Sequence, residues 1–278
     1  MNYLIYKKLQ SGSFGSVYNI IDYNNKEDNI VIKLEKNKKH NTLQNEYKIY
    51  QILTNNNYVP KFYNYIIKDI YNILVIENVG LSLDIILSKS CYYNLDYYKK
   101  YNIKYNIFHP YLINLFITQG IEILNYLRNN KILHKDIKPG NFVIQNNHLR
   151  IIDFGLASIK GDNNHINKNK CGNLRFCSIN IYNNKYNYEY SYKDDLESFL
   201  FTLIYFIIGY LPWQLGLIYE YEKKDNYNIS KLYEKSKKIL NYWKITNNLN
   251  INIEYNIKSI INNLNIHNGK NNIKSNNE

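Results

Sequence analysis

Hydrophobic and polar residues alternate from residue 3 to about residue 35. With a Gly-rich turn inside it, this alternation predicts a small antiparallel sheet that begins with strands at residues 4–9, 16–23 and 29–34. Residues 42–53 instead carry apolar side chains at roughly helical spacing, so we expect a helix that packs on this sheet. Two further strands are expected at residues 62–67 and 71–77.

The pattern changes after Gly80. Helical apolar spacing with few helix breakers predicts helices at residues 83–87, 111–129, 194–210 and 229–243. Between them, residues 142–144 and 149–152 predict a hairpin around a turn at 145–148. The expected class is α+β, with a small β-rich lobe at 1–77, a hinge at 78–81 and a larger, mainly helical lobe at 82–264. The polar residues 265–278 predict a disordered tail.

Composition narrows the class of protein only slightly. A chain of 278 residues with 45% hydrophobic content can bury one substantial core. The formal charge of +12 suits acidic proteins, nucleic acid or a membrane surface, and by itself does not choose among them. The chain is rich in Asn, Lys, Ile and Tyr, including 31 Tyr, and these residues have AT-rich codons. This bias favours a source such as a large AT-rich DNA virus or an intracellular parasite over a functional pattern.

Neither a disulfide framework nor a membrane segment is indicated. Cys91, Cys171 and Cys177 are unevenly spaced and read as reduced thiols rather than as a disulfide or zinc framework. The longest apolar run, at 199–211, is too short to cross a bilayer and predicts a buried helix. We therefore expect a cytoplasmic protein, in the host cytoplasm if the source is a virus, with the nucleus still open as a location.

The most specific chemistry lies in the run from His134 to Asn141, which reads His-Lys-Asp-Ile-Lys-Pro-Gly-Asn and is followed by Asp-Phe-Gly at 153–155. This spacing is typical of a phosphoryl-transfer site. Asp136 is the expected catalytic base, and Lys138 is expected to stabilise charge on the transferred phosphoryl group. Asn141 and Asp153 offer the oxygen ligands that Mg²⁺ prefers. The alternative, a polar loop and turn that merely end strands, fits the combined spacing poorly.

A turn between the first two predicted strands carries Gly12 and Gly15. Small residues at a turn let backbone N–H groups approach phosphate oxygens, although turn chemistry alone also selects glycine. Leu9 before this turn and Val17 after it are expected to contact the nucleotide, with Val17 over the adenine ring.

Lys33 ends the third predicted strand and Glu46 lies on the helix that follows. Taken singly, each would ordinarily be a solvated surface residue. Their order after the Gly-containing turn instead predicts an ion pair that holds Lys33 against the α- and β-phosphates of ATP.

Together these motifs resemble those of the eukaryotic-type Ser/Thr protein kinases. A narrower resemblance, to the casein kinase 1 family and its vaccinia-related kinase relatives, rests on further segments, notably Ser-Ile-Asn at 178–180, Asp-Asp-Leu-Glu-Ser at 194–198 and Leu-Pro-Trp-Gln at 211–214. The resemblance implies a two-lobed kinase fold, ATP and Mg²⁺ as cofactors, and Ser/Thr transfer to acidic or phosphorylated proteins. It also implies activity without activation-loop phosphorylation, and we expect a monomer.

The same resemblance assigns roles to residues outside the motifs. The carbonyl of Glu77 and the N–H of Val79 should meet adenine, with Ile76 as the gatekeeper. Asp195 should anchor the catalytic loop from the helix beneath it. Arg175 matches an anion-binding Arg near the substrate site, with Lys223 or Lys224 as a looser candidate for its basic partner.

Several positions depart from the family pattern. Gln10 replaces a Gly of the phosphate loop, Val31 replaces an Ala that contacts adenine, and Lys135 replaces the Arg before the catalytic Asp. Gln10 and Val31, together with an expected reduction of the C-terminal lobe, motivate an alternative, a pseudokinase-like scaffold or binding protein with weak or no transfer activity. A small-molecule kinase fits less well because the segments at 138–139 and 178–180 resemble protein-substrate machinery. No recognised nucleic-acid-binding motif accompanies the basic charge.

Overall fold

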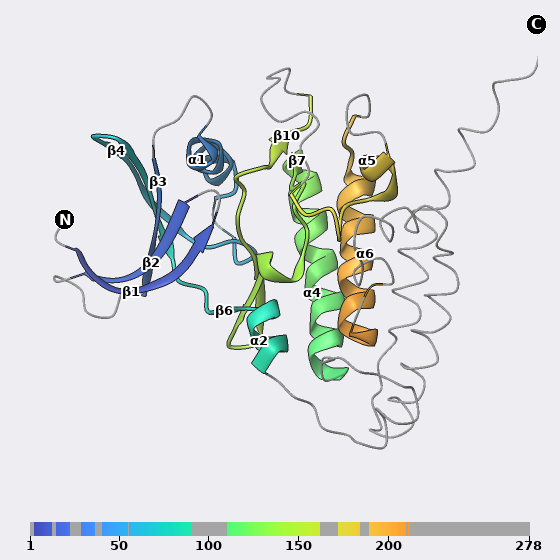
Figure 1. Ribbon diagram of the computed structural model, residues 1–278. Coiled ribbons are helices and arrows are strands. Elements are labelled where there is room, and N and C mark those ends of the chain that lie inside the picture. The colour runs from blue at the N-terminus through green and yellow to red at the C-terminus, as the bar shows by residue number, and fades with distance from the viewer. Residues whose placement is uncertain are drawn as a thin grey trace, which may run out of the picture.

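The computed structural model of the chain describes residues 3–12, 15–22, 29–36, 41–54, 56–89, 110–161, 172–183, 189–209 and 211. In this part of the chain, a five-stranded sheet with one helix precedes a mainly helical region (Figure 1). The α+β class is therefore confirmed. The helix predicted at 229–243, the predicted tail and the Tyr- and Lys-rich stretch at 91–109 lie outside the described residues.

The first sheet is antiparallel throughout and has the strand order β1-β2-β3-β5-β4. Its five strands lie within a few residues of their predicted bounds: β1 Tyr3–Gly12, β2 Gly15–Asp22, β3 Ile30–Lys36, β4 Phe62–Lys68 and β5 Tyr71–Glu77. Leu74, Val75 and Ile76 of β5 are almost fully buried. β3 and β5 are inner strands of this sheet, and β3 carries Lys33.

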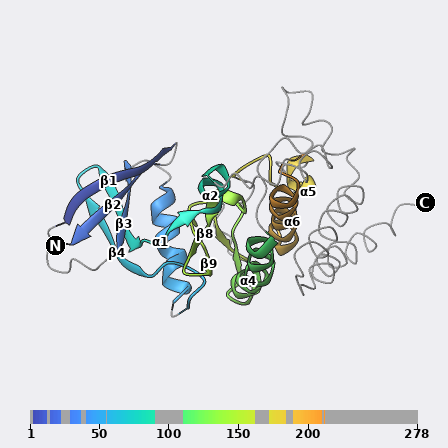
Figure 2. The ribbon, with the colours of Figure 1, turned by 90° about the horizontal axis from the view of Figure 1, so that it is seen from below.

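Helix α1, Thr42–Ile52, packs against this sheet as predicted (Figures 1 and 2). Its apolar face buries Leu43, Ile49 and Tyr50, and Tyr47 stacks on Tyr65 of β4 at a centroid distance of 4.6 Å. Helical spacing places these side chains on one side, so burial against the sheet fixes which residues of α1 face inward.

Helices α4, Pro110–Asn129, and α6, Tyr192–Ile208, lie side by side in the second region (Figures 1 and 2). At Gly120 of α4, a Cβ atom would overlap the ring of Phe199 on α6, so glycine permits their close approach. A capping box between Ser191 and Asp194 begins α6, and Gly209, with φ of 79°, ends it. The predicted burial of the apolar run is confirmed along α6. Among the helices that the structure describes, none has the length and apolar character of a membrane span.

A short sheet connects the two regions. Strand β6, Leu81–Ser82, pairs with β8, Phe142–Gln145, which pairs with β9, His148–Ile151. Asn146 and Asn147 form the two-residue turn with φ of 50° and 62°, as hairpins of this length require. The predicted hairpin is confirmed, with a tighter turn than the residues 145–148 that the sequence predicts.

Three short helices and two bridging strands complete the described fold. They are α2 Leu83–Lys89, the 3-10 helix η1 Pro139–Asn141, α5 Ile179–Asn183, and the pair β7 Ile132–Leu133 and β10 Ser158–Ile159. Apart from α2, whose first five residues the sequence predicts, these elements are too short for a periodic pattern to reveal them.

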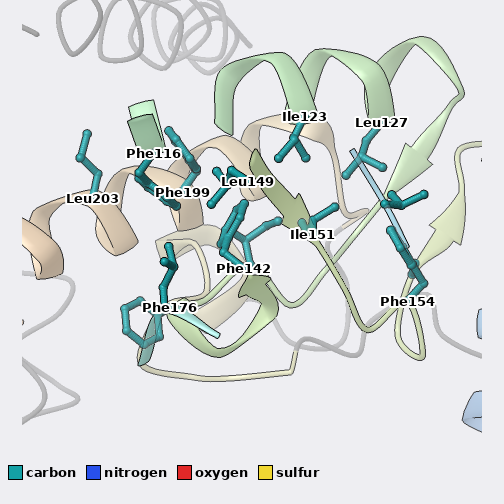
Figure 3. Packing of buried hydrophobic residues seen from close by; sticks show 14 of the residues in the cluster. Phe116, Ile123, Leu127, Phe142, Leu149, Ile151, Phe154, Phe176, Phe199 and Leu203 are labelled. Carbon is teal, nitrogen blue, oxygen red and sulfur yellow. The ribbon is translucent and has the colours of Figure 1, made fainter. Parts of the chain in front are cut away.

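An aromatic cluster holds the β8–β9 hairpin against the helices (Figure 3). Phe116 of α4 stacks on Phe199 of α6 at 4.6 Å and meets the ring of Phe142 on β8 edge-on at 4.9 Å. All three rings are almost fully buried. Because the hairpin starts after Asn141 and ends shortly before Asp153, this packing fixes the positions of both predicted metal ligands.

Candidate active site

The segment that carries Asp136 is held from below by Asp195 of α6. The Asp195 carboxylate accepts the backbone N–H groups of His134 at 2.8 Å and Lys135 at 2.9 Å, and the hydroxyl of Tyr190 at 2.8 Å. Lys135 has a φ of 66°, a conformation that costs free energy in a residue with a Cβ atom and that these bonds hold in place. The contact expected of Asp195 is present in the structure.

The two carboxylate oxygens of Asp136 have different surroundings. Oδ2 accepts from Nζ of Lys138 at 2.6 Å and from Nδ2 of Asn141 at 3.0 Å, while Oδ1 is buried and has no hydrogen-bond partner among the residues that the structure describes. Asn141 also donates to the Asp136 carbonyl at 2.8 Å. The carboxylate is thus fixed through one oxygen, and the other is an acceptor that lacks a donor, as a base awaiting a hydroxyl group would be.

Gly172 lies directly against this carboxylate. Its N–H donates to the carbonyl of Lys135 at 3.1 Å, and a Cβ atom at position 172 would overlap the side chain of Asp136. Only 5% of the Asp136 side chain is exposed. Sequence reasoning gave Gly172 no role, because its partner is more than thirty residues away along the chain.

Lys33 of β3 and Glu46 of α1 form the predicted ion pair. Nζ of Lys33 lies 2.7 Å from Oε1 of Glu46 and 3.9 Å from Oδ1 of Asp153, and the Glu46 side chain is 1% exposed. Burial alone would lower the pKa of Lys33, but the charges of Glu46 and Asp153 outweigh it and raise that pKa. The ammonium group is therefore a permanent cation beside Asp153.

Asp153 adopts a φ of 70° and keeps 43% of its side chain exposed. Desolvation by the surrounding protein atoms would raise the pKa of this carboxyl group, but Lys33, Lys138 and His134 together hold that pKa below its ordinary value. A backbone N–H bond from Gly155 acts in the same direction. Asp153 is thus an ionised carboxylate that is open to the solvent.

The chemistry of Asn141 and Asp153 fits a hard cation such as Mg²⁺. Because Nδ2 of Asn141 is engaged by Asp136, the orientation of the amide leaves Oδ1 as its possible metal ligand. An amide oxygen and an ionised carboxylate are oxygen ligands of the kind that Mg²⁺ takes together with substrate phosphates and water. Within the described ranges there is no group of three or more His, Cys, Asp or Glu side chains arranged to hold a metal ion.

Several of the residues predicted to contact the nucleotide lie on the first three strands. Leu9 of β1 is 47% exposed, and Gly12 pairs with Gly15 across the β1–β2 turn. Gly15 has a φ of 138°, and a Cβ atom there would overlap the Leu34 carbonyl oxygen, so the turn requires glycine. Val17 of β2 lies opposite Lys33 of β3 in the sheet. The tip of the turn, at 13–14, lies outside the described residues.

The last residue of β5 connects the two regions through a polar contact that the sequence did not predict. The side chain of Glu77 accepts from Arg150 of β9 at 2.9 Å and from the N–H of Lys61 at 3.0 Å. The N–H of Asn78 donates to the carbonyl of Asn29 at 2.7 Å. Val79, whose N–H is expected to meet adenine, and Ile76, the expected gatekeeper, are both buried.

Arg175 lies in the turn that leads to α5. Its backbone N–H donates to Oδ1 of Asn173 at 2.9 Å, and its charge opposes the rise that burial causes in the pKa of Tyr205 on α6. The ring of the next residue, Phe176, meets the ring of Tyr205 edge-on at 5.6 Å, so this turn lies beside α6. Lys223 and Lys224 lie outside the described residues.

Comparisons with known proteins agree with this arrangement. The family model for the protein kinase domain matches residues 3–271 of the chain. Among solved structures, the crystal structure of a Plasmodium kinase domain superposes with a TM-score of 0.64 and 21% sequence identity, over 77% of this chain and 67% of that chain. The N-terminal antiparallel sheet with its helix and the helical C-terminal region are thus the protein kinase fold.

Proposed function

This chain belongs to the protein kinase family, and from that premise we propose that it is a Ser/Thr protein kinase similar to the casein kinase 1 family. It transfers the γ-phosphate of ATP to hydroxyl groups of proteins. The observation that carries the proposal is the ion pair between Lys33 and Glu46, formed at 2.7 Å with Asp153 beside it. In protein kinases this pair and the metal-binding Asp must both be in place for transfer.

Each proposed role follows from a contact in the site. Lys33, kept charged by Glu46, binds the α- and β-phosphates. Asn141 and Asp153 hold Mg²⁺, which when bound neutralises charge on the phosphates. Asp136, fixed through Oδ2, uses Oδ1 to orient the substrate hydroxyl and accept its proton. Lys138 is then the cation nearest to Asp136 and stabilises charge that develops during transfer.

The preferred substrates are acidic or already phosphorylated proteins. Arg175 is half-buried in the segment whose Gly172 contacts the catalytic loop, and the whole chain carries a charge of +12. Both features favour anionic partners. A peptide with one acceptor Ser, compared with the same peptide phosphorylated at a second residue, tests this preference. We expect a higher kcat/KM for the phosphorylated peptide and a loss of that preference in Arg175→Ala. Equal values for both peptides would contradict the preference.

A second candidate function is a nucleotide-binding scaffold with little or no transfer. The observation in its favour is the contact of Gly172 with Asp136, which leaves the carboxylate almost without exposure. Transfer requires that a substrate hydroxyl reach Oδ1 of Asp136. In an active kinase the 172–178 segment must therefore move away from this oxygen when substrate binds. Gln10 and Val31, which depart from the family pattern, also favour the scaffold function, although neither removes a reacting group.

Transfer of labelled γ-phosphate from Mg-ATP to casein, and to the protein itself, separates the two functions. We expect transfer to Ser or Thr by the wild type. The Asp136→Asn variant should lose roughly two to four orders of magnitude in kcat, as removal of a general base does. Thermal unfolding and ATP binding should remain close to wild type. A folded wild type that binds ATP and transfers nothing would establish the scaffold instead.

A further inference from the structure

Asn45, the residue before Glu46 on α1, contacts the loop that follows the predicted metal ligand Asp153. Its Nδ2 lies 3.2, 3.1 and 2.8 Å from the carbonyl oxygens of Phe154, Gly155 and Ala157, and because the amide carries two hydrogens, two of these acceptors share one N–H. The amide orientation follows from the partners: an oxygen in the place of Nδ2 would face three carbonyl oxygens and bond with none. One side chain therefore binds three of the four residues after Asp153.

These carbonyl groups need a donor. Residues 153–157 have no regular secondary structure, so their carbonyl groups accept no hydrogen bond of a regular helix or strand ladder. The N–H of Ala157 closes a turn onto the carbonyl of Phe154 at 3.0 Å, and the turn starts from the left-handed conformation of Asp153. Without Asn45, the carbonyls of Gly155 and Ala157 would lose this donor. The left-handed conformation of Asp153 would also lose a restraint.

The two adjacent residues Asn45 and Glu46 act on the same loop from the same helix. Glu46 accepts a hydrogen bond from the backbone N–H of Phe154 as well as from Lys33. The ring of Phe154 is buried and meets Tyr50 of α1 edge-on at 5.4 Å. Helix α1 therefore contacts this loop at the N–H of Phe154, at three carbonyl groups and at the ring of Phe154.

We propose that Asn45 is a positioning residue for the metal ligand Asp153. By holding the carbonyls at 154, 155 and 157, it fixes the direction in which the Asp153 carboxylate leaves the backbone. It thereby sets the affinity of the nucleotide site for Mg²⁺, in the way that outer partners of metal ligands ordinarily do. This inference rests on the proposed function only in assuming that the site binds ATP with Mg²⁺.

The Asn45→Leu variant tests the proposal because leucine has a similar volume and no donor. ATP binding is measured by calorimetry at a series of Mg²⁺ concentrations, without any phosphate transfer. We expect the Mg²⁺ concentration for half-maximal enhancement of ATP binding to rise about tenfold, the lower end of the effect of removing such a partner. ATP binding at saturating Mg²⁺ should approach the wild-type value.

The matched control is Gln44→Leu, the same kind of change at the preceding, exposed position of α1. It should leave the Mg²⁺ dependence unchanged. Asn45→Ala repeats the test without a bulky side chain, and all variants are compared below their unfolding midpoints. A Mg²⁺ dependence within twofold of wild type in the Asn45 variants, or an equal loss of ATP binding at every Mg²⁺ concentration, would overturn the proposal. Absence of phosphate transfer by the wild type would refute the proposed function and leave this comparison intact.

Discussion

Glu35 accepts both the backbone N–H and the hydroxyl group of Thr42, at 3.2 and 2.9 Å. Its second oxygen accepts the N–H of Leu43 at 2.9 Å. Thr42 and Leu43 are the first two residues of α1, and Asn41 before them provides no side-chain cap. A carboxylate from β3 therefore takes the place of the usual N-terminal cap and also complements the positive end of the helix dipole.

The Glu35→Gln variant should show what this cap contributes. An amide keeps the shape of the side chain but replaces one accepting oxygen with a donor and removes the charge. We expect the free energy of unfolding to fall by about 1 kcal/mol, the usual cost of a lost helix cap. Because α1 also carries Glu46, the rate of phosphate transfer should fall as well. Urea titration and kcat measure the two effects. Glu122→Gln, at an exposed position of α4, is the control and should change neither.

The Lys33 and Glu46 pair predicts a separation of stability from activity. Lys33→Met leaves a carboxylate that is 1% exposed without its cation, a change that typically costs about 3–5 kcal/mol of unfolding free energy. Addition of Glu46→Gln should restore much of that stability by removing the isolated charge. Neither variant should transfer phosphate, because the phosphate-binding cation is absent in both.

The Lys33 and Glu46 pair also predicts how the stability of the Lys33→Met variant changes with pH. In Lys33→Met, the pKa of Glu46 should rise well above its unfolded value, so the folded state binds the extra proton. Stability of this single variant, relative to the double variant, should therefore be greatest below the unfolded pKa and fall as the pH rises through the folded pKa. Unfolding of both variants at several pH values from 4 to 8 provides the measurement. Parallel curves would show that Glu46 is not the group responsible.

Gly172 predicts a defect confined to the chemical step. A methyl group at this position would overlap the carboxylate of Asp136, so in Gly172→Ala either the loop or the base must move. A displacement of the base by about 1 Å can cost roughly 100-fold in rate, and we expect a loss of that order in kcat. ATP binding should be nearly unchanged because Lys33 and Asp153 lie on other elements. A kcat lowered roughly 100-fold with wild-type ATP affinity would fit this account. An unchanged kcat would show that the segment moves aside without displacing Asp136.

Lys135 predicts a second pH effect, at the alkaline end. Burial lowers the pKa of its side chain from 10.5 to about 8, although Asp195 opposes the shift. Between these two values the unfolded chain binds more protons than the folded protein, so this group makes stability rise with pH. Relative to Lys135→Met, the wild type should gain free energy of unfolding from pH 8 to pH 10. Taking the difference between the two proteins removes the titration of their tyrosines. A difference that stays constant with pH would place the pKa of Lys135 near its ordinary value.

The sequence predicts elements well where their side chains repeat. Five strands, helix α1 and the long helices α4 and α6 were predicted within a few residues, because burial against one face imposes a period on each. Elements such as β7, β10 and α5 have five residues or fewer and leave no such pattern. They form because neighbouring segments hold them in place.

The residues of the candidate site also differ in how far the sequence predicts them. Residues whose proposed roles depend on local spacing, such as Asp136 and Asn141, could be proposed from the chain alone. Glu35, Asn45 and Arg150 could not be given a role, since each acts through partners defined only by the fold. Asn45, for example, binds carbonyl groups more than one hundred residues away, and backbone acceptors carry no signature in a sequence.

Strand β3 presents Lys33 and Glu35 two residues apart, so both side chains leave the same face of the strand. Lys33 donates to Glu46 in the middle of α1, and Glu35 accepts from Thr42 in its first turn. Insertion or deletion of one residue within β3, before Lys33, would turn both side chains to the opposite face at once. Gene variants of this protein should therefore tolerate length changes in β3 far less than substitutions there, and its register fixes the position of α1.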